Sequence, residues 1–252
     1  FFDAQKQIQQ EERNDDASPQ YYLEFPIETW ESSVLGVRNL LKAIEGTKVK
    51  LFHSSTSEVY GDALENPQTE DYWGNVNSIG VRACYDEGKR AAEALIYDYI
   101  RKYDVDVRVA RIFNTYGPKM RKEDGRIISN FVNQALFNEN ITIYGEGKQT
   151  RSFCYIDDTL DFILKLMSFD KKIPFPINVG NPVEISVLDV ANIIKNTVNT
   201  VKPDLMQHDA MKDDPQKRKP NINKAKEILN WEPKIDFNIG LEKTIKYFAG
   251  RK

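Results

Sequence analysis

The first clear pattern along the chain is a helical spacing of apolar side chains between residues 26 and 44. Its members are Trp30, Val34, Val37, Leu40, Leu41 and Ile44. They recur at intervals of three and four residues, which predicts one helix with a single buried face. Pro26 stands at its start, where the first helical turn tolerates the missing N–H group.

Apolar runs and helical segments alternate after that helix. Residues 49–55 (VKLFHSS) predict a buried strand, 84–103 a second long helix and 106–114 a second strand. Further helices are expected at 125–138, 155–169, 186–198, 223–231 and 240–248, and strands at 141–145 and 174–181. This order predicts an α/β fold, a Rossmann-like parallel sheet with flanking helices plus a smaller C-terminal α/β lobe. Ligands of such sheets bind at the carboxyl ends of the strands.

Composition and charge exclude several classes of function. Of the 252 residues, 40% are hydrophobic, enough to bury a large core. The net charge of −3 argues against a nucleic-acid partner, whose binding face is usually basic. With two cysteines and two histidines, a Cys/His metal site is not expected. The sequence holds no apolar run of about 18 residues, so no membrane segment is expected and we predict a cytoplasmic protein.

A cluster of polar side chains follows the first predicted strand. The stretch HSSTSEVYG places Thr56, Ser57 and the carboxylate of Glu58 at the strand tip. A chain that merely turns would use Gly, Asn or Pro there. The alternative for Glu58 is an ordinary solvated carboxylate at a strand end. The hydroxyl groups and the acid together favour a site that handles protons or sugar hydroxyls.

Tyr85 and Lys89 lie four residues apart on the second long helix, so their side chains are neighbours. An ammonium group beside a phenol favours the phenolate, and we expect a pKa of Tyr85 below its usual value. A phenol of this kind can remove a proton from a sugar hydroxyl. Taken alone, a Tyr-x-x-x-Lys spacing is also common on ordinary amphipathic helices.

Several strings in order resemble one family. They are STSEVYG, EDYWGNVN, CYDEGKR, RIFNTYGP, DGRIISNF, YGEGKQTRSF, NVGNP and DDPQKRKPNINKAKEILNWEP. They are similar to UDP-glucuronate decarboxylases of the UDP-xylose synthase type, in the extended short-chain dehydrogenase/reductase family. The resemblance covers nearly the whole chain. It implies an NAD-dependent decarboxylation of UDP-glucuronate to UDP-xylose through a 4-keto intermediate.

The resemblance also implies roles for particular residues. Tyr85, assisted by Lys89 and Thr56, would take the proton of the 4-hydroxyl group, and Tyr85 and Lys89 would also contact NAD. Glu58 and Ser57 would orient the carboxyl end and the ring of the sugar. Arg218 matches the family arginine that stabilises the enolate; a solvated basic turn is the alternative for QKRKP.

Substrate, cofactor and partner expectations follow from the same comparison. Asn114, Arg126 and Arg151 are candidates for the diphosphate, because Arg grips phosphate oxygens in a bidentate fork. Tyr144 would contact the uracil. The domains would be 1–115, a partial NAD-binding unit, and 116–252, mainly the nucleotide-sugar lobe. A homodimer would form through helices near 26–44 and 82–103.

One departure concerns the cofactor half. The first glycine is Gly36, so the Gly-rich turn that cradles the NAD pyrophosphate in this family is not expected in the chain. About 80 to 90 residues of the first βαβ half would then be missing. We therefore expect weak NAD binding and an exposed sheet edge beside residues 49–55. A Golgi or ER-lumenal form stays open for the same reason.

Three functions remain open on sequence grounds. In related 4,6-dehydratases an Asp-Glu pair stands at the strand tip, whereas here the first position is Ser57, which favours decarboxylation. Another NAD-dependent UDP-sugar enzyme, either a 4-epimerase or a decarboxylase that releases the 4-keto pentose, is the first alternative. A non-catalytic nucleotide-sugar-binding paralogue is the second.

Overall fold

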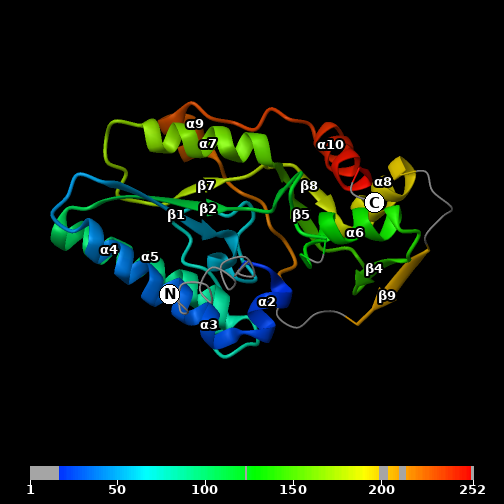
Figure 1. Cartoon of the computed structure of the whole chain (residues 1–252), viewed down its shortest axis with the longest axis horizontal. Helices are drawn as coiled ribbons and strands as arrows, with labels where there is room; N and C mark the ends of the chain where they lie inside the picture. The colour runs from blue at the N-terminus through cyan, green and yellow to red at the C-terminus, as the bar shows by residue number, and fades with distance from the viewer. Residues whose placement is uncertain (1–16, 123, 199–203, 210–213, 251–252) are drawn as a thin grey trace, which may run out of the picture.

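The chain was analysed as a computed structural model that describes residues 17–122, 124–198, 204–209 and 214–250. A parallel three-stranded sheet lies at its centre (Figure 1), in the order β1 (Lys50–Thr56), β2 (Asp106–Ile112) and β7 (Ile177–Val179). Lys50 pairs with Asp106 at one end of the β1–β2 ladder and Thr56 with Ile112 at the other. The predicted α/β class with a parallel sheet is thereby confirmed.

Helices cover both faces of this sheet, as parallel sheets require. Figure 1 shows α4 (Val37–Ile44) and α5 (Ala83–Tyr103) on one face, and α7 (Ile156–Ser168) and α9 (Asn223–Leu229) on the other. The central strand β2 is buried on both sides, and its residues Val107, Val109 and Ala110 are almost fully buried. Leu41 and Ile96 from the first helix pair pack on one face of β2, and Phe162 and Trp231 belong to the core of the other.

The helix predicted over residues 26–44 is interrupted. It consists of α3 (Pro26–Glu31), a π-helical turn η1 (Ser32–Gly36) and α4, and it follows the short helix α2 (Pro19–Glu24). Val37, Leu41 and Ile44 are buried as expected, but Trp30 is 38% exposed and Leu40 53% exposed. The buried positions of the segment are Thr29, Ser33, Val37, Leu41 and Ile44, and they continue through the π turn at intervals of four and three residues. One buried face is therefore confirmed, but Trp30 and Leu40 do not belong to it.

A second group of elements packs beside the sheet around its own core, which includes Phe131, Ile143, Phe153, Val190 and Leu241. Its members are β3 (Thr115–Tyr116), α6 (Ile127–Leu136), β4 (Ile141–Tyr144), β5 (Thr150–Ser152), β6 (Cys154–Tyr155), β8 (Glu184–Ser186), α8 (Val187–Val198), β9 (Leu205–His208) and α10 (Phe237–Ala249). They form the two-stranded pairs β3–β6, β4–β9 and β5–β8. A division after residue 115 stays a prediction, and β7 from the later part of the chain belongs to the central sheet.

Three further features bear on the expectations. Within the described residues β1 pairs with β2 alone, so its other edge has no strand neighbour there. Cys84 and Cys154 are free and buried. None of the helices in the described ranges is long and apolar enough to cross a membrane.

Candidate functional site

A cavity of about 550 Å³ opens at the carboxyl ends of β1 and β2, between the sheet and the second group of elements. The side chains predicted from the sequence all line it. They are Thr56, Ser57, Glu58, Tyr85, Lys89, Asn114, Arg126, Tyr144, Arg151 and Arg218. The structure thus brings together residues from β1, α5, β2 and the later loops, as the parallel topology predicts. Their individual roles remain predictions.

The tip of β1 turns sharply into the cavity. A 3₁₀ turn, η2 (Ser57–Tyr60), follows the strand, and the Oγ1 atom of Thr56 accepts a hydrogen bond from the backbone N–H of Glu58 at 3.2 Å. This cap fixes the direction in which the chain leaves the strand. Thr56 and Ser57 are buried, and the Glu58 side chain is 12% exposed.

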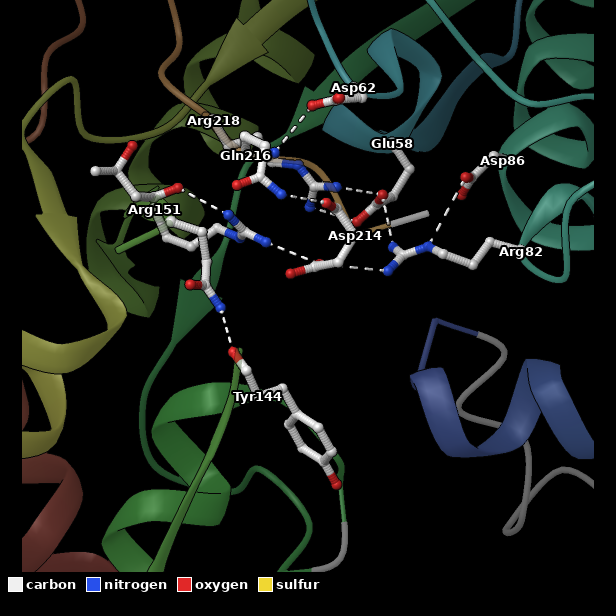
Figure 2. Close-up of polar contacts among 11 residues, drawn as sticks. Glu58, Asp62, Arg82, Asp86, Tyr144, Arg151, Asp214, Gln216 and Arg218 are labelled. Carbon is white, nitrogen blue, oxygen red and sulfur yellow. Dashed lines mark hydrogen bonds and ion pairs between the residues drawn. The ribbon is translucent and has the colours of Figure 1, made fainter. Parts of the chain in front are cut away.

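Glu58 is held by two guanidinium groups (Figure 2). Arg218 donates to both carboxylate oxygens, and Arg82 donates to Oε2 at 2.7 Å. Burial by itself would raise the pKa of this carboxyl, but Arg218 and Arg82 outweigh it and hold the pKa at about 2. Glu58 is therefore ionised at neutral pH and acts as a fixed anion, not as a proton donor.

The neighbourhood of Tyr85 differs from the expectation. Burial raises the pKa of Tyr85, although a hydrogen bond with Thr56 and the charge of Arg126 act in the opposite direction. The Nζ atom of Lys89 lies 5.7 Å from the centre of the phenol ring and donates to the carbonyl oxygen of Ser54 at 3.0 Å. The predicted lowering was wrong for this geometry, because the loss of water outweighs the nearby charges.

Asn114 follows β2 and faces the same cavity. Its carbonyl oxygen accepts a hydrogen bond from the backbone of Cys154. The side-chain Nδ2 atom is buried and has no hydrogen-bond partner within the part of the chain that the structure describes. A buried donor without a partner is costly, so this atom is a good candidate for a contact with a bound ligand.

The basic candidates are already engaged with acids. Arg126 forms an ion pair with Asp124 at 2.9 Å, and the buried Arg151 donates to Asp214 at 2.8 Å. Tyr144 lies on β4, and its ring is 5.6 Å from that of His208. Figure 2 shows this ring apart from the arginine cluster. An anionic ligand at Arg151 would have to exchange with the carboxylate of Asp214.

Several cavity residues were missed by sequence reasoning. Arg82 and Asp214 line the wall beside Glu58, and Tyr22 stacks on Tyr85 with ring centres 5.1 Å apart. The position of Arg82, three residues before Tyr85 at the start of α5, was an available signal for a shared helical face. Nothing in the sequence pattern pointed to Tyr22.

The buried carboxylate of Asp86 adjoins this cluster. Its Oδ2 atom is 3.9 Å from the Nε atom of Arg82. Burial and the negative charge of Glu58 raise the pKa of Asp86 to about 7, against the lowering effect of Arg82 and Arg218. Within the described ranges, no group of three or more His, Cys, Asp or Glu residues has an arrangement that could hold a metal ion.

Three kinds of comparison relate the chain to known proteins. The chain is 48% identical over 227 residues to UDP-glucuronic acid decarboxylase 6 of Arabidopsis thaliana, a match that covers 89% of the chain and 65% of that protein. Across the first curated relatives, the chain spans 52% to 65% of their length. The activity, substrate and partners of this chain are therefore proposals.

Solved structures agree with the fold. UDP-glucose 4-epimerase from Thermotoga maritima, solved with UDP-glucose, superimposes with a TM-score of 0.85 at 26% identity, over 93% of this chain and 75% of the epimerase. UDP-glucuronic acid 4-epimerase from Bacillus cereus, solved with UDP-glucuronic acid and NAD, gives 0.81 at 25% identity, over 88% and 68%.

The sequence model of one family, described as GDP-mannose 4,6 dehydratase, matches residues 17–244. This range includes the sheet, the cavity and almost all of the second group of elements. The chain therefore belongs to the GDP-mannose 4,6-dehydratase family of extended short-chain dehydrogenase/reductases.

Proposed function

We propose that the chain carries the substrate-binding and proton-transfer part of a UDP-glucuronate decarboxylase, which converts UDP-glucuronate to UDP-xylose through a 4-keto intermediate. One observation carries the proposal: Tyr85 and the Glu58–Arg218 ion pair line the same cavity. The identity of 48% to a named decarboxylase over most of the chain supports it.

The described residues fit the reactive end of NAD. Tyr85, Lys89 and Ser54 line one wall of the cavity beside β1. Lys89 supplies an ammonium group there and Tyr85 a hydroxyl group, which suit the ribose and the nicotinamide. Bound there, NAD would supply a reversible hydride acceptor for the 4-carbon of the sugar.

Proton transfer and charge stabilisation fall to the chain itself. Tyr85 would take the proton of the 4-hydroxyl group as the 4-carbon gives up its hydride, which gives a ketone β to the carboxylate. The hydrogen bond with Thr56 and the charge of Arg126 favour the phenolate that this step needs. Carbon dioxide departs with its bonding electrons left on the carbon skeleton as an enolate. Arg218, aligned by both oxygens of Glu58, places a guanidinium group where that negative charge develops.

The pair Ser57–Glu58 favours decarboxylation over dehydration. Dehydration needs a proton donor for the departing hydroxyl, and Glu58 is held ionised by its two arginines. Ser57 is buried and carries no carboxyl group. A substrate that brings its own leaving group requires no such acid.

The nucleotide would lie toward the second group of elements. Asn114 offers its unpaired Nδ2 atom, and Arg151 and Arg126 offer guanidinium groups for the diphosphate. Tyr144 at the end of β4 is half-exposed and can lie against the uracil ring.

The test is to incubate the chain with NAD and UDP-glucuronate and to weigh the nucleotide sugar by mass spectrometry. We expect the mass of carbon dioxide to be lost. Tyr85→Phe and Glu58→Gln should each lower the rate ~10²- to 10⁴-fold. Arg101→Gln, an exposed change on the same helix, is the control and should leave it unaltered.

A 4-epimerase is the second candidate, because the Bacillus cereus structure that resembles this chain is an epimerase solved with UDP-glucuronic acid and NAD. Epimerisation keeps the mass of the sugar and changes only its configuration. A decarboxylase that releases the 4-keto pentose would lose carbon dioxide but skip the final reduction. A non-catalytic paralogue would bind UDP and turn nothing over. The mass and the configuration of the product separate all of these.

The proposal includes a homodimer through α3, α4 and α5. Apolar side chains stand exposed on the first two of these helices, with Ile27 at 66% and Leu40 at 53% exposure. Tyr103 near the end of α5 is also exposed. Apolar side chains that gather on neighbouring helices are typical of an interface between copies.

A further inference from the structure

Arg82 occupies a central position in the cavity wall. It directly precedes α5, three residues before Tyr85, and its side chain is 12% exposed. Its Nη2 atom donates a hydrogen bond to Oε2 of Glu58 at 2.7 Å. Arg218 reaches the same carboxylate from the C-terminal segment, so Glu58 is gripped from two separate parts of the chain (Figure 2).

The same guanidinium group also lies against the pair of stacked rings formed by Tyr22 and Tyr85. The Cζ atom of Arg82 lies 5.8 Å from the centre of the Tyr22 ring. Tyr22 in turn stacks on Tyr85, with ring centres 5.1 Å apart and planes 11° from parallel. One side chain therefore links the fixed anion and the phenol across the cavity.

Two further acids restrict the position of Arg82. A carboxylate oxygen of Asp86 lies 3.9 Å from its Nε atom, and one of Asp214 lies 3.7 Å from its Nη1 atom. Asp214 is shared with Arg151 on β5, as Figure 2 shows. A planar guanidinium group with donors on three sides suits these three partners, which a single ammonium point charge does not.

We propose that Arg82 is a positioning residue of the decarboxylation: it fixes the carboxylate of Glu58 relative to Tyr85 and leaves Arg218 aligned toward the substrate. This inference rests on the proposed function. Arg82 acts through Glu58 and through the Tyr22–Tyr85 stack, and it takes no proton itself.

The electrostatics of Glu58 agree with this arrangement. Buried carboxylates tend to hold their protons, and Arg218 and Arg82 are the two largest influences that oppose burial at Glu58. The other charged or titratable groups near the pair are Asp86, Asp214, Arg151 and Tyr22. Without Arg82, Glu58 keeps Arg218 as its hydrogen-bonded cation and loses the other one. The pKa of Glu58 should therefore rise.

The decisive experiment follows the carboxyl carbon of Glu58 by carbon-13 NMR from about pH 3 to pH 8. The signal is assigned by its loss in Glu58→Gln. In the parent chain the signal should stay that of the anion over most of this range. In Arg82→Gln the apparent pKa should rise by about one pH unit or more, and Arg82→Lys, which keeps the charge, should restore much of the parental curve. Arg101→Gln on the exposed side of α5 is the matched control.

Turnover gives the second readout. With UDP-glucuronate and NAD, Arg82→Gln should lower kcat by ~10- to 100-fold, the usual effect of a lost hydrogen bond to a charged group. The Kd for UDP, measured by calorimetry, should stay within about twofold, because Arg82 is not a proposed diphosphate ligand and is connected to Arg151 only through the shared Asp214. The loss should deepen toward acidic pH as Glu58 becomes protonated.

Superimposable Glu58 titrations in the parent and in Arg82→Gln would overturn the inference, whether or not the chain turns over substrate. Equal titrations in Arg82→Gln and Arg82→Lys would overturn it as well. Should Arg82→Gln not fold by circular dichroism, Arg82→Met, which keeps the aliphatic stem on Tyr22, carries the same comparison. A parent chain that binds UDP but forms no product would contradict the proposed function and leave the NMR test intact.

Discussion

Glu58 keeps its charge in a buried place because Arg82 and Arg218 surround it. We propose that this carboxylate orients the two arginines and takes no part in proton transfer. Asp86, which adjoins Arg82, is in the opposite situation. Burial and the charge of Glu58 disfavour its ionised form. Two neighbouring carboxyl groups are thus separated into one that is always ionised and one that titrates near neutrality.

The raised pKa of Asp86 predicts a pH-dependent stability. The folded-state value of about 7 lies above the ordinary 3.8, so between these limits the folded chain binds more protons than the unfolded chain. The contribution of Asp86 to stability is therefore greatest at acidic pH and falls as pH rises through 7. Asp86→Asn should be more stable than the parent at pH 8 by about 1 kcal/mol or more. The difference should shrink toward pH 4.

Urea unfolding at several pH values measures this difference. Asp98→Asn, a change at an exposed carboxylate on the same helix, is the control. If Asp86→Asn and the parent lost stability in parallel between acidic and alkaline pH, Asp86 would not be the titrating group.

Sequence reasoning found the residues of this site but not their charges. Thr56 and Glu58 could be named because they are polar residues that follow a predicted strand. Tyr85 could be named because it shares a helix face with Lys89. The pKa of Glu58 depends on Arg82 and Arg218, which are 24 and 160 residues away, and the pKa of Tyr85 depends mainly on its burial. Only folding decides such partners, so neither the pKa of Glu58 nor that of Tyr85 could be inferred from local spacing.

The spacing of apolar residues predicted which segments form helices and strands better than it predicted whether a helix is regular throughout. The helix expected over 84–103 is α5, and the strand expected over 106–114 is β2 with two residues fewer at its end. The segment 26–44 was expected to be uniform because its apolar spacing allows a regular helix. The π turn at Ser32–Gly36 has no signature in that spacing, and it interrupts the regular α-helix between α3 and α4.

Adjacent leucines on α4 give a sharp test of which face is buried. Leu41 is fully buried among Ile96, Val107 and Val109, whereas Leu40 is 53% exposed. Leu41→Ala should lower the free energy of unfolding by ~2–5 kcal/mol through the lost contacts and the cavity left behind. Leu40→Ala should change it by about 0.5 kcal/mol or less. Denaturant titrations of the two variants are compared directly, and equal losses would show that the helix is rotated from the position described.

The cavity lies between the central sheet and the second group of elements, which has an apolar core of its own. Residues from α5 and from the C-terminal segment meet over the sheet ends, so the cavity forms only when both groups of elements are folded. The helices α4 and α5 cover one face of the sheet (Figure 1). Exposed apolar side chains on α3 and α4 include Ile27 and Leu40. This surface is where a second copy is proposed to bind.

A matched pair of charge substitutions tests that interface. Ile27 on α3 is 66% exposed, and Leu164 on α7, across the sheet, is 67% exposed. Ile27→Glu should convert a dimer to a monomer, because a charge buried at an apolar interface loses its hydration. Leu164→Glu should leave the dimer intact. Light scattering coupled to size-exclusion chromatography gives the masses, and a parent chain that elutes as a monomer would refute the proposed dimer.

The central claim is that Tyr85 and the Glu58–Arg218 pair act on one sugar that supplies its own leaving group. The most direct measurement uses UDP-glucuronate labelled with carbon-13 in its carboxyl group, incubated with the chain and NAD in a sealed vessel. We expect the label to appear as carbon dioxide, and its release to fall ~10²- to 10⁴-fold in Tyr85→Phe and in Glu58→Gln. Label that remains in a nucleotide sugar of altered configuration, or release that persists in both variants, would contradict it.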